Sequence, residues 1–167
     1  GTWANGSFTQ PSRSVYEAVK ETVGENGEVV YAQGSNFTEE FSLKNGSYSV
    51  PTDSLLKDAV KAAEQSDVII AAVGEPSGWT GEASSRQNPS LPECQKRMLK
   101  ALKATGKPVV VVILAGRPLV LTEEDAAFST LVEAWHGGTM AGQALSDVLF
   151  GKVNPSAKLT TTFPRYV

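Results

Sequence analysis

The stretch Val68-Ile69-Ile70-Ala71-Ala72-Val73 is a run of six apolar residues that ends at Gly74. A strand that is apolar at every position is typical of a parallel sheet with helices on both faces. Residues 108–114, which include four consecutive valines, repeat this pattern further along the chain. Residues 131–135 and 29–32 are shorter apolar segments that we also interpret as strands. The sequence therefore predicts a mostly parallel sheet.

Amphipathic segments alternate with these predicted strands. Apolar residues three and four positions apart form one helix face before the first strand, at Leu55, Leu56, Ala59, Val60 and Ala63. A helix cap is expected at Asp53 or Ser54. The same spacing predicts helices from Ser14 to about Val23 and over 93–104, 123–128 and 139–150. Because crossover helices must pack on the sheet, we expect a three-layer α/β/α sandwich in a single domain spanning residues 1–167.

Composition excludes several classes of function. The net charge is −3 and the 15 Lys and Arg residues are scattered, which argues against a nucleic-acid partner. The longest apolar run, 109–115, is far shorter than the roughly 20 residues that cross a bilayer, so we expect no membrane span. One Cys and one His give no metal-site spacing, and no phosphate-binding glycine motif follows a predicted strand. We therefore expect neither a metal nor a cofactor.

Two polar stretches are predicted to lack helices. Residues 1–13 are rich in turn-forming residues and are expected to form an extended lead-in. Residues 33–52 are expected to form a long loop with a small hairpin. The start at Gly1, without Met, predicts a fragment or a mature protein.

Ligands of open parallel sheets usually bind at the carboxyl ends of the strands. In this chain the corresponding loops are 74–92, 115–118 and 136–139. These loops are also where the sequence becomes distinctive. Residues 73–86 read VGEPSGWTGEASSR and 101–119 read ALKATGKPVVVVILAGRPL, while DVLFG at 147–151, NPSAKL at 154–159 and FPR at 163–165 follow in order.

These blocks resemble the C-terminal domain of glycoside hydrolase family 3, strongly over 55–167 and weakly over 1–3. The resemblance implies a flavodoxin-like sandwich that forms the second domain of a retaining β-glucosidase and packs against a preceding TIM-type barrel. The barrel would supply the nucleophilic Asp, so the 167-residue chain alone is expected to be inactive. The resemblance also implies a periplasmic or secreted location. Residues 138–141 depart from the family, because they read GTMA where Gly-Thr-Glu-Gly is usual.

The resemblance places the candidate site in the loop 74–92. Glu82 is the candidate for the acid/base or for a contact to sugar hydroxyls, against the alternative of a solvated loop carboxylate. Trp79 is a candidate stacking platform or interdomain contact. Ser84, Ser85 and Arg86 are candidate substrate contacts, although Arg86 would equally shape the loop by holding Glu82 or a carboxylate of the barrel.

Five further residues have simpler interpretations. Glu75 is expected to accept hydrogen bonds from loop amides. Arg117 is expected to tie its loop to a carboxylate or to backbone carbonyls. His136 is expected to be structural or exposed, and Trp135 and Cys94 are expected to pack in the core.

Two other functions are alternatives to hydrolysis of a β-linked glucoside or oligosaccharide. The first is a non-catalytic module that binds carbohydrate or another domain. The second is a nucleotide or flavin binder, which the lack of phosphate-binding loops disfavours. The family's opening strand would lie ahead of Gly1, and an unpaired sheet edge predicts self-association of the chain.

Overall fold

The computed structural model describes residues 12–37, 52–76 and 79–167. Its centre is a parallel sheet in the order β1-β2-β3, formed by Ile69–Gly74, Val109–Leu114 and Leu131–Glu133. Ile69 pairs with Val109 and Val111 pairs with Leu131, so the three strands run in register. The predicted parallel arrangement is confirmed for all three strands.

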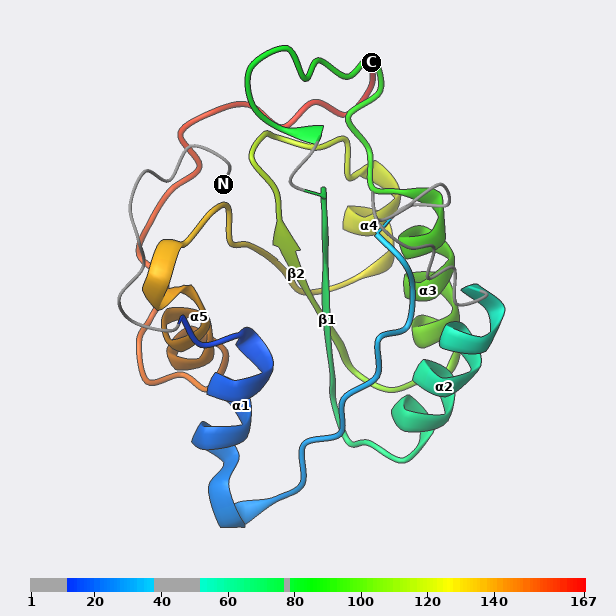
Figure 1. Ribbon diagram of the computed structural model, residues 1–167, viewed down its shortest axis with the longest axis vertical. Coiled ribbons are helices and arrows are strands. Elements are labelled where there is room, and N and C mark those ends of the chain that lie inside the picture. Colours follow the sequence, from blue (N-terminus) through cyan, green and yellow to red (C-terminus); the bar gives the residue numbers. More distant parts are fainter. Residues whose placement is uncertain (1–11, 38–51, 77–78) are drawn as a thin grey trace, which may run out of the picture.

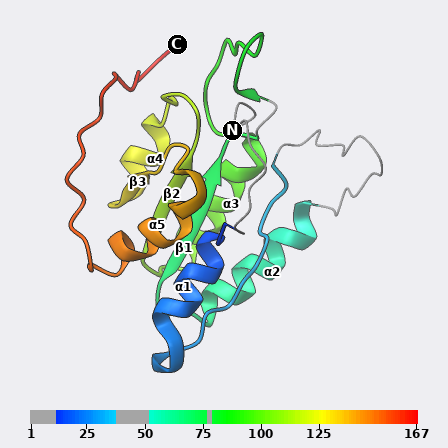
Figure 2. The same cartoon turned by 60° about the vertical axis from the view of Figure 1, so that its left-hand side comes forward.

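Helices cover both faces of the sheet, as expected for a three-layer α/β/α sandwich (Figures 1 and 2). The helices α2, Thr52–Glu64, and α3, Glu93–Ala104, lie together on one face. The helices α1, Val15–Val23, and α5, Ala141–Leu149, pack on each other on the opposite face. The short helix α4, Thr122–Ala127, connects β2 to β3.

The main core lies between the sheet and the helices α2 and α3. Its members are apolar residues from alternate strand positions and from one face of each helix: Ala59, Ala63, Ala71, Val73, Met98, Leu99, Leu102, Val111 and Ile113. Alternate residues of a strand point to opposite faces, which explains why Ala71 and Val73 share this core. The helix face predicted from the spacing of Leu55, Ala59 and Ala63 is buried as expected.

The contact between α1 and α5 depends on a hydroxyl pair and a glycine. Ser14 caps α1 in a reciprocal arrangement with Glu17. The hydroxyl oxygens of Thr22 and Ser146 lie 2.8 Å apart across the two helices. A Cβ atom on Gly142 would lie 2.4 Å from the carbonyl oxygen of Arg13, so only glycine lets α5 approach the start of α1 this closely.

Several predicted boundaries shift and one predicted strand is wrong. The helix α2 begins at Thr52, which places Asp53 inside its first turn. A 3-10 turn, Gly138–Met140, precedes α5 within the region predicted as one helix. Residues 29–32 form no strand, because no described strand pairs with them, and Val30 and Tyr31 are exposed. The predicted hairpin and most of the lead-in lie outside the described residues.

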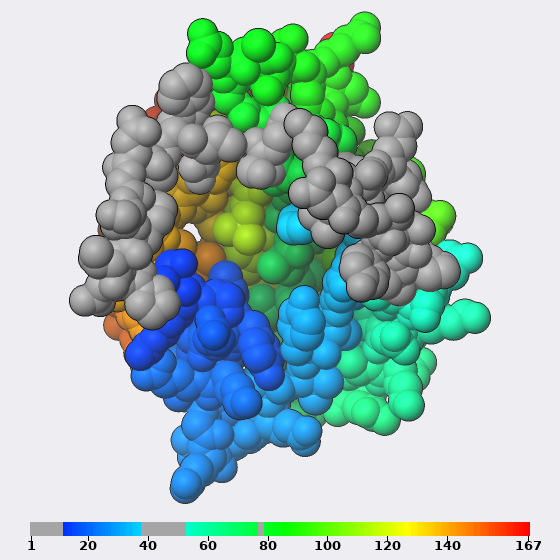
Figure 3. Space-filling view, viewed as in Figure 1, coloured from blue at the N-terminus to red at the C-terminus, as the bar shows by residue number. Residues whose placement is uncertain are grey.

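One side of the sheet remains partly open. In the described sheet β1 pairs only with β2, so its other edge is unpaired. Ala72, on the face toward α1, is exposed. Figure 3 shows atoms of β1 and β2 between α1 and the segment 29–37. No helix in the described part of the chain is long and apolar enough to span a membrane.

Candidate functional site

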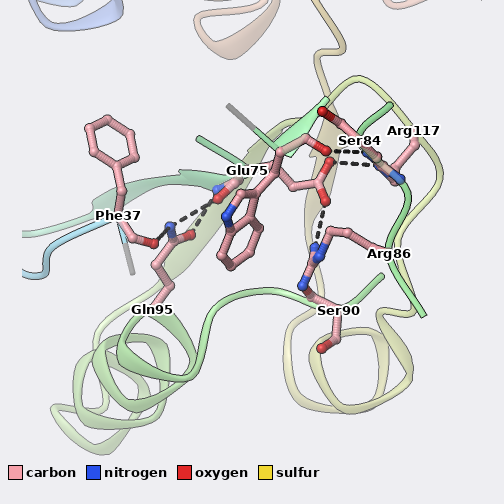
Figure 4. A network of polar contacts seen from close by, with 9 residues as sticks. Phe37, Glu75, Ser84, Arg86, Ser90, Gln95 and Arg117 are labelled. Carbon is pink, nitrogen blue, oxygen red and sulfur yellow. Dashed lines mark hydrogen bonds and ion pairs between the residues drawn. The ribbon is translucent and has the colours of Figure 1, made fainter. Parts of the chain in front are cut away.

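The carboxylate of Glu75 organises the loop that follows β1. Its side chain is fully buried, and its two oxygens bind different arginines (Figure 4). Nη1 of Arg86 lies 2.5 Å from Oε1, and Nε of Arg117 donates to Oε2 at 3.1 Å. Glu75 is structural, as expected, but its side-chain partners are guanidinium groups rather than loop amides.

Arg117 ties the loop 115–118 to the loop 74–92. Beyond Glu75, its Nη2 donates to the carbonyl oxygens of Trp79 and of Ser84, the latter at 2.9 Å. The predicted bonds of Arg117 to a carboxylate and to backbone carbonyls are both confirmed. Two loops from neighbouring strands are therefore fixed to each other by one guanidinium group.

Arg86 shapes the same loop from the other side. Its Nη1 also donates to the carbonyl oxygen of Ser90 at 3.1 Å, and its guanidinium group lies 4.1 Å from the centre of the Trp79 ring. Of the two carboxylates considered for Arg86, Glu82 makes no bond with it in the described structure, and Arg86 holds Glu75 instead. Because the guanidinium group of Arg86 lies over the Trp79 ring, one face of that ring is covered and is not open to a ligand.

Glu82 lies at the tip of a tight turn held by this cluster. The amide of Ser84 donates to the carbonyl oxygen of Gly81 at 3.3 Å, which closes a turn with Glu82 and Ala83 at its centre. Ala83 has a φ of 58°, a left-handed conformation that a non-glycine residue seldom adopts. Glu82 is exposed and makes no hydrogen bond or ion pair with the described residues. The turn therefore presents a free carboxylate to solvent.

The remaining candidates lie close by in the chain but differ in exposure. Ser84 is half-buried and contributes its carbonyl oxygen to Arg117, whereas Ser85 is exposed. Trp79 is half-buried. The structure thus brings Trp79, Ser84 and Arg86 together around Glu75, with Glu82 and Ser85 on the outer side of the same loop.

Gly74 and Gln95 fix the point where the loop leaves β1. The side-chain amide of Gln95 donates to the carbonyl oxygens of Gly74 and Phe37, and its Oε1 accepts a bond from the amide of Gly74 at 2.8 Å (Figure 4). Gln95 thereby supplies the backbone of Gly74 with the bonds that a neighbouring strand would otherwise make. Neither residue was singled out from the sequence, because a Gln in a helix gives no local signal of this contact.

The third loop meets the other two at Gly116. A Cβ atom on Gly116 would lie 2.8 Å from Cε1 of His136 and 3.2 Å from Cγ2 of Thr80. These two side chains come from the loops 136–139 and 74–92, so all three predicted loops do converge at the carboxyl end of the sheet. His136 is exposed, as expected.

Glu133, at the end of β3, is a polar residue that is not among the candidates predicted from the sequence. Its Oε1 accepts a bond from the amide of Trp135 at 3.1 Å, while its buried Oε2 has no hydrogen-bond partner among the described residues. Burial raises the pKa of the carboxyl to about 7, against the opposing effect of the Trp135 amide. A Glu in an otherwise apolar strand is the signal that would have identified it.

Trp135 and Cys94 are packed to different extents. Cys94 is 1% exposed, which confirms its expected burial. Trp135 is only half-buried and contacts the ring of Phe163 edge-on, with 5.7 Å between the ring centres. The described residues contain no cluster of three or more His, Cys, Asp or Glu side chains suited to a metal ion.

Comparison with known proteins identifies the family. The model of the glycosyl hydrolase family 3 C-terminal domain matches residues 1–167. The chain belongs to this family. The periplasmic beta-glucosidase of Salmonella typhimurium is 40% identical over 100% of this family 3 domain, and the thermostable beta-glucosidase B of Acetivibrio thermocellus is 38% identical over 95% of it. A beta-xylosidase of Formosa agariphila is also 38% identical, over 92%.

Solved structures agree with this assignment. The family 3 beta-glucosidase of Bifidobacterium adolescentis aligns with 93% of the domain at a TM-score of 0.79 and 28% identity, covering 21% of that chain. The beta-glucosidase of Listeria innocua in complex with isofagomine aligns with 91% of it, and with 19% of that chain, at a TM-score of 0.71 and 36% identity. The domain spans 20–23% of the length of the three relatives named above.

Proposed function

We propose that this chain is the second domain of a longer, retaining β-glucosidase and that it presents Glu82 to a sugar-binding cleft shared with an N-terminal barrel. The observation that carries the proposal is the cluster of Glu75, Arg86 and Arg117. These side chains form ion pairs that anchor one another, and they hold a turn at which Glu82 makes no hydrogen bond or ion pair with the described residues. A rigid loop that leaves one carboxylate free is well suited to acid/base catalysis or to binding a hydroxyl group.

The chemistry of retention explains why a second domain would be needed. Retaining glycosidases use two carboxyl groups about 5 Å apart, one as nucleophile and one as acid/base. In the proposed enzyme Glu82 is the acid/base, and the nucleophilic Asp comes from the barrel. Two relatives are named beta-glucosidases, and this domain matches only about a fifth of their length, which supports an enzyme with further catalytic residues outside this domain.

The other candidate side chains receive supporting roles. Ser84 and Ser85 border the turn of Glu82 and offer hydroxyl groups to a sugar. Trp79 and Arg86 stack on each other, and we propose that the free face of Trp79 contacts the sugar or the barrel. By analogy with the Salmonella relative, the enzyme would be periplasmic or secreted.

A non-catalytic carbohydrate-binding or interdomain module is the second candidate. A shallow open groove of about 380 Å³ between residues 30–33 and α2 lies apart from the Glu82 loop, and this candidate would place a ligand or a neighbouring domain there. Self-association through the free edge of β1 also stays a prediction. A monomeric mass in solution scattering would contradict it.

The test compares aryl β-glucoside hydrolysis by the 167-residue chain, by the barrel-containing protein and by that protein with Glu82→Gln. We expect turnover by the longer protein only. If Glu82 is the acid, Glu82→Gln should slow substrates with poor leaving groups by orders of magnitude and substrates with very acidic phenols far less, because the latter need little protonation. Glu25→Gln, at an exposed Glu distant in sequence, serves as the matched control.

Equal loss on all leaving groups would assign Glu82 to substrate binding rather than to proton transfer. Near-normal turnover by Glu82→Gln would contradict any role for this residue. Sugar binding by the barrel-containing protein without hydrolysis would favour the non-catalytic module.

A further inference from the structure

The chain bends sharply just after β3 ends at Glu133. Trp135 has a φ of 50°, and it is one of only two non-glycine residues with positive φ in the described structure. A bulky side chain in this left-handed conformation is strained, so neighbouring contacts must maintain it. Among the contacts of the described residues at this bend, the amide of Ala134 donates to the carbonyl oxygen of Ile113 at 2.8 Å, and the amide of Trp135 itself donates to Oε1 of Glu133 at 3.1 Å.

The surroundings of Oε2, the other carboxyl oxygen of Glu133, suit an apolar side chain better than a carboxyl group. The bond from the Trp135 amide to Oε1 is therefore the feature that explains a Glu at this position. Oε2 is buried and lacks a hydrogen-bond partner among the described residues. Buried polar atoms are nearly always paired, so an apolar side chain of the same length would fill the position at a lower cost in desolvation. The remaining advantage of a carboxyl group here is the acceptor that Oε1 offers to the bend.

The bend determines where the third loop runs. His136 follows Trp135 directly, and its Cε1 lies beside Gly116, close enough that a Cβ atom there would be 2.8 Å away. Thr80, from the loop that carries Glu82, packs against the same glycine. The bend at Trp135 immediately precedes His136, so it sets the direction from which residue 136 approaches the surroundings of the candidate site. The ring of Phe163 contacts the ring of Trp135 and is a further contact of the residue at the bend.

We propose that Glu133 is a positioning residue of the sugar cleft: by accepting the Trp135 amide it fixes the left-handed bend that holds His136 against Gly116 and the Glu82 loop. The inference deepens the function proposed above and depends on it for its catalytic consequence. Glu133 itself touches no substrate in this assignment. Its effect on the reaction passes through the packing of the three loops around Gly116.

The catalytic test uses the barrel-containing protein and two variants of similar side-chain length. Glu133→Gln keeps an acceptor at Oε1, whereas Glu133→Met fills the volume without an acceptor. We expect Glu133→Met to lower kcat/KM roughly tenfold or more, since small displacements of a site are costly, and Glu133→Gln to stay within about threefold of the parent. Equal activities of the two variants would overturn the proposal, because volume alone would then explain the position.

The structural test does not require activity. His136 is the only His of the 167-residue chain, so its Cε1 proton gives a single resolved signal in NMR spectra of that chain. We expect nuclear Overhauser contacts from this proton to Gly116 in the parent and in Glu133→Gln, and their loss in Glu133→Met. If the longer protein hydrolyses no β-glucoside, the proposed function fails while this measurement still decides the positioning role.

A second pair of variants tests the bend if Glu133→Met does not fold. Trp135→Gly and Trp135→Val both remove the ring that contacts Phe163, but only glycine adopts a positive φ without strain. The contacts between His136 and Gly116 should persist in Trp135→Gly and disappear in Trp135→Val. If these contacts persisted in both variants, or were lost in both, the left-handed bend at Trp135 would not be what positions the loop 136–139.

Discussion

Nε of Arg117 donates to Oε2 of Glu75 at 3.1 Å, and this bond joins the loops that follow two neighbouring strands. The Glu75 side chain is fully buried, while that of Arg117 is 24% exposed. The carboxylate is thus the inner partner, and it cannot regain water when the arginine is lost. This asymmetry determines how the loops respond to substitution.

We predict that Glu75→Gln lowers the free energy of unfolding by about 2–4 kcal/mol, because it leaves two partly buried guanidinium groups without their counter-ion. Urea unfolding followed by circular dichroism measures the change. Glu21→Gln is the control, since it breaks the exposed ion pair with Arg13 and should cost no more than about 1 kcal/mol. Equal effects of the two variants would show that Glu75 is not the anchor of the loop.

Gln95→Leu is expected to destabilise the chain by about 2–4 kcal/mol, because it leaves the buried amide and carbonyl of Gly74 without partners. Thermal or urea unfolding tests this expectation. Gln143→Leu removes a bond to Asp147 one helical turn away and should change stability by less than about 1 kcal/mol. A cost at Gln95 as small as that at Gln143 would contradict the strand-like role of its side chain.

Gly74→Ala should prevent normal folding or shift the end of β1, because the new Cβ atom would lie 1.9 Å from the carbonyl oxygen of Leu114. Gly106→Ala is the matched control: Gly106 also has a positive φ, of 74°, but open space surrounds its Cβ position. That control should cost only the strain of a left-handed alanine, about 1–2 kcal/mol. Soluble yield and unfolding midpoints distinguish the two variants.

The pKa of Glu133 predicts a stability that falls with rising pH. Burial raises the pKa of the folded carboxyl from 4.5 to about 7, so the folded chain binds more protons than the unfolded chain between these values. The contribution of Glu133 is therefore present below pH 4.5 and is lost as the pH rises toward and through 7. The loss is at most about 3–4 kcal/mol.

Urea unfolding at pH 5 and pH 8 measures this difference, and Glu133→Gln should reduce it because the amide does not titrate. Burial also raises the pKa of Glu124, which contributes in the same direction. The comparison of the parent with Glu133→Gln isolates Glu133 from that background. An unchanged pH dependence in the variant would show that Glu133 does not titrate in this range.

The candidate site was only partly predictable from sequence. The motif around Glu82 and the position of its loop after a buried strand were accessible, and so was the tying role of Arg117. The partner of Arg86 was not, because Glu82 and Glu75 are both near it in the chain and only the fold buries one of them. Glu133, Gln95 and Gly116 act through contacts between segments far apart in the sequence.

The sequence by itself determined the three paired strands, the helices between them and the edge of the sheet where the loops gather. These features follow from local periodicity and from continuous apolar runs such as 109–114, which have few alternatives to burial in a sheet. Tertiary structure decided that residues 29–32 form no strand, because pairing requires a neighbour that local β-propensity cannot provide. It also decided which carboxylates are buried, paired or free, since burial and charge pairing arise only when distant segments come together.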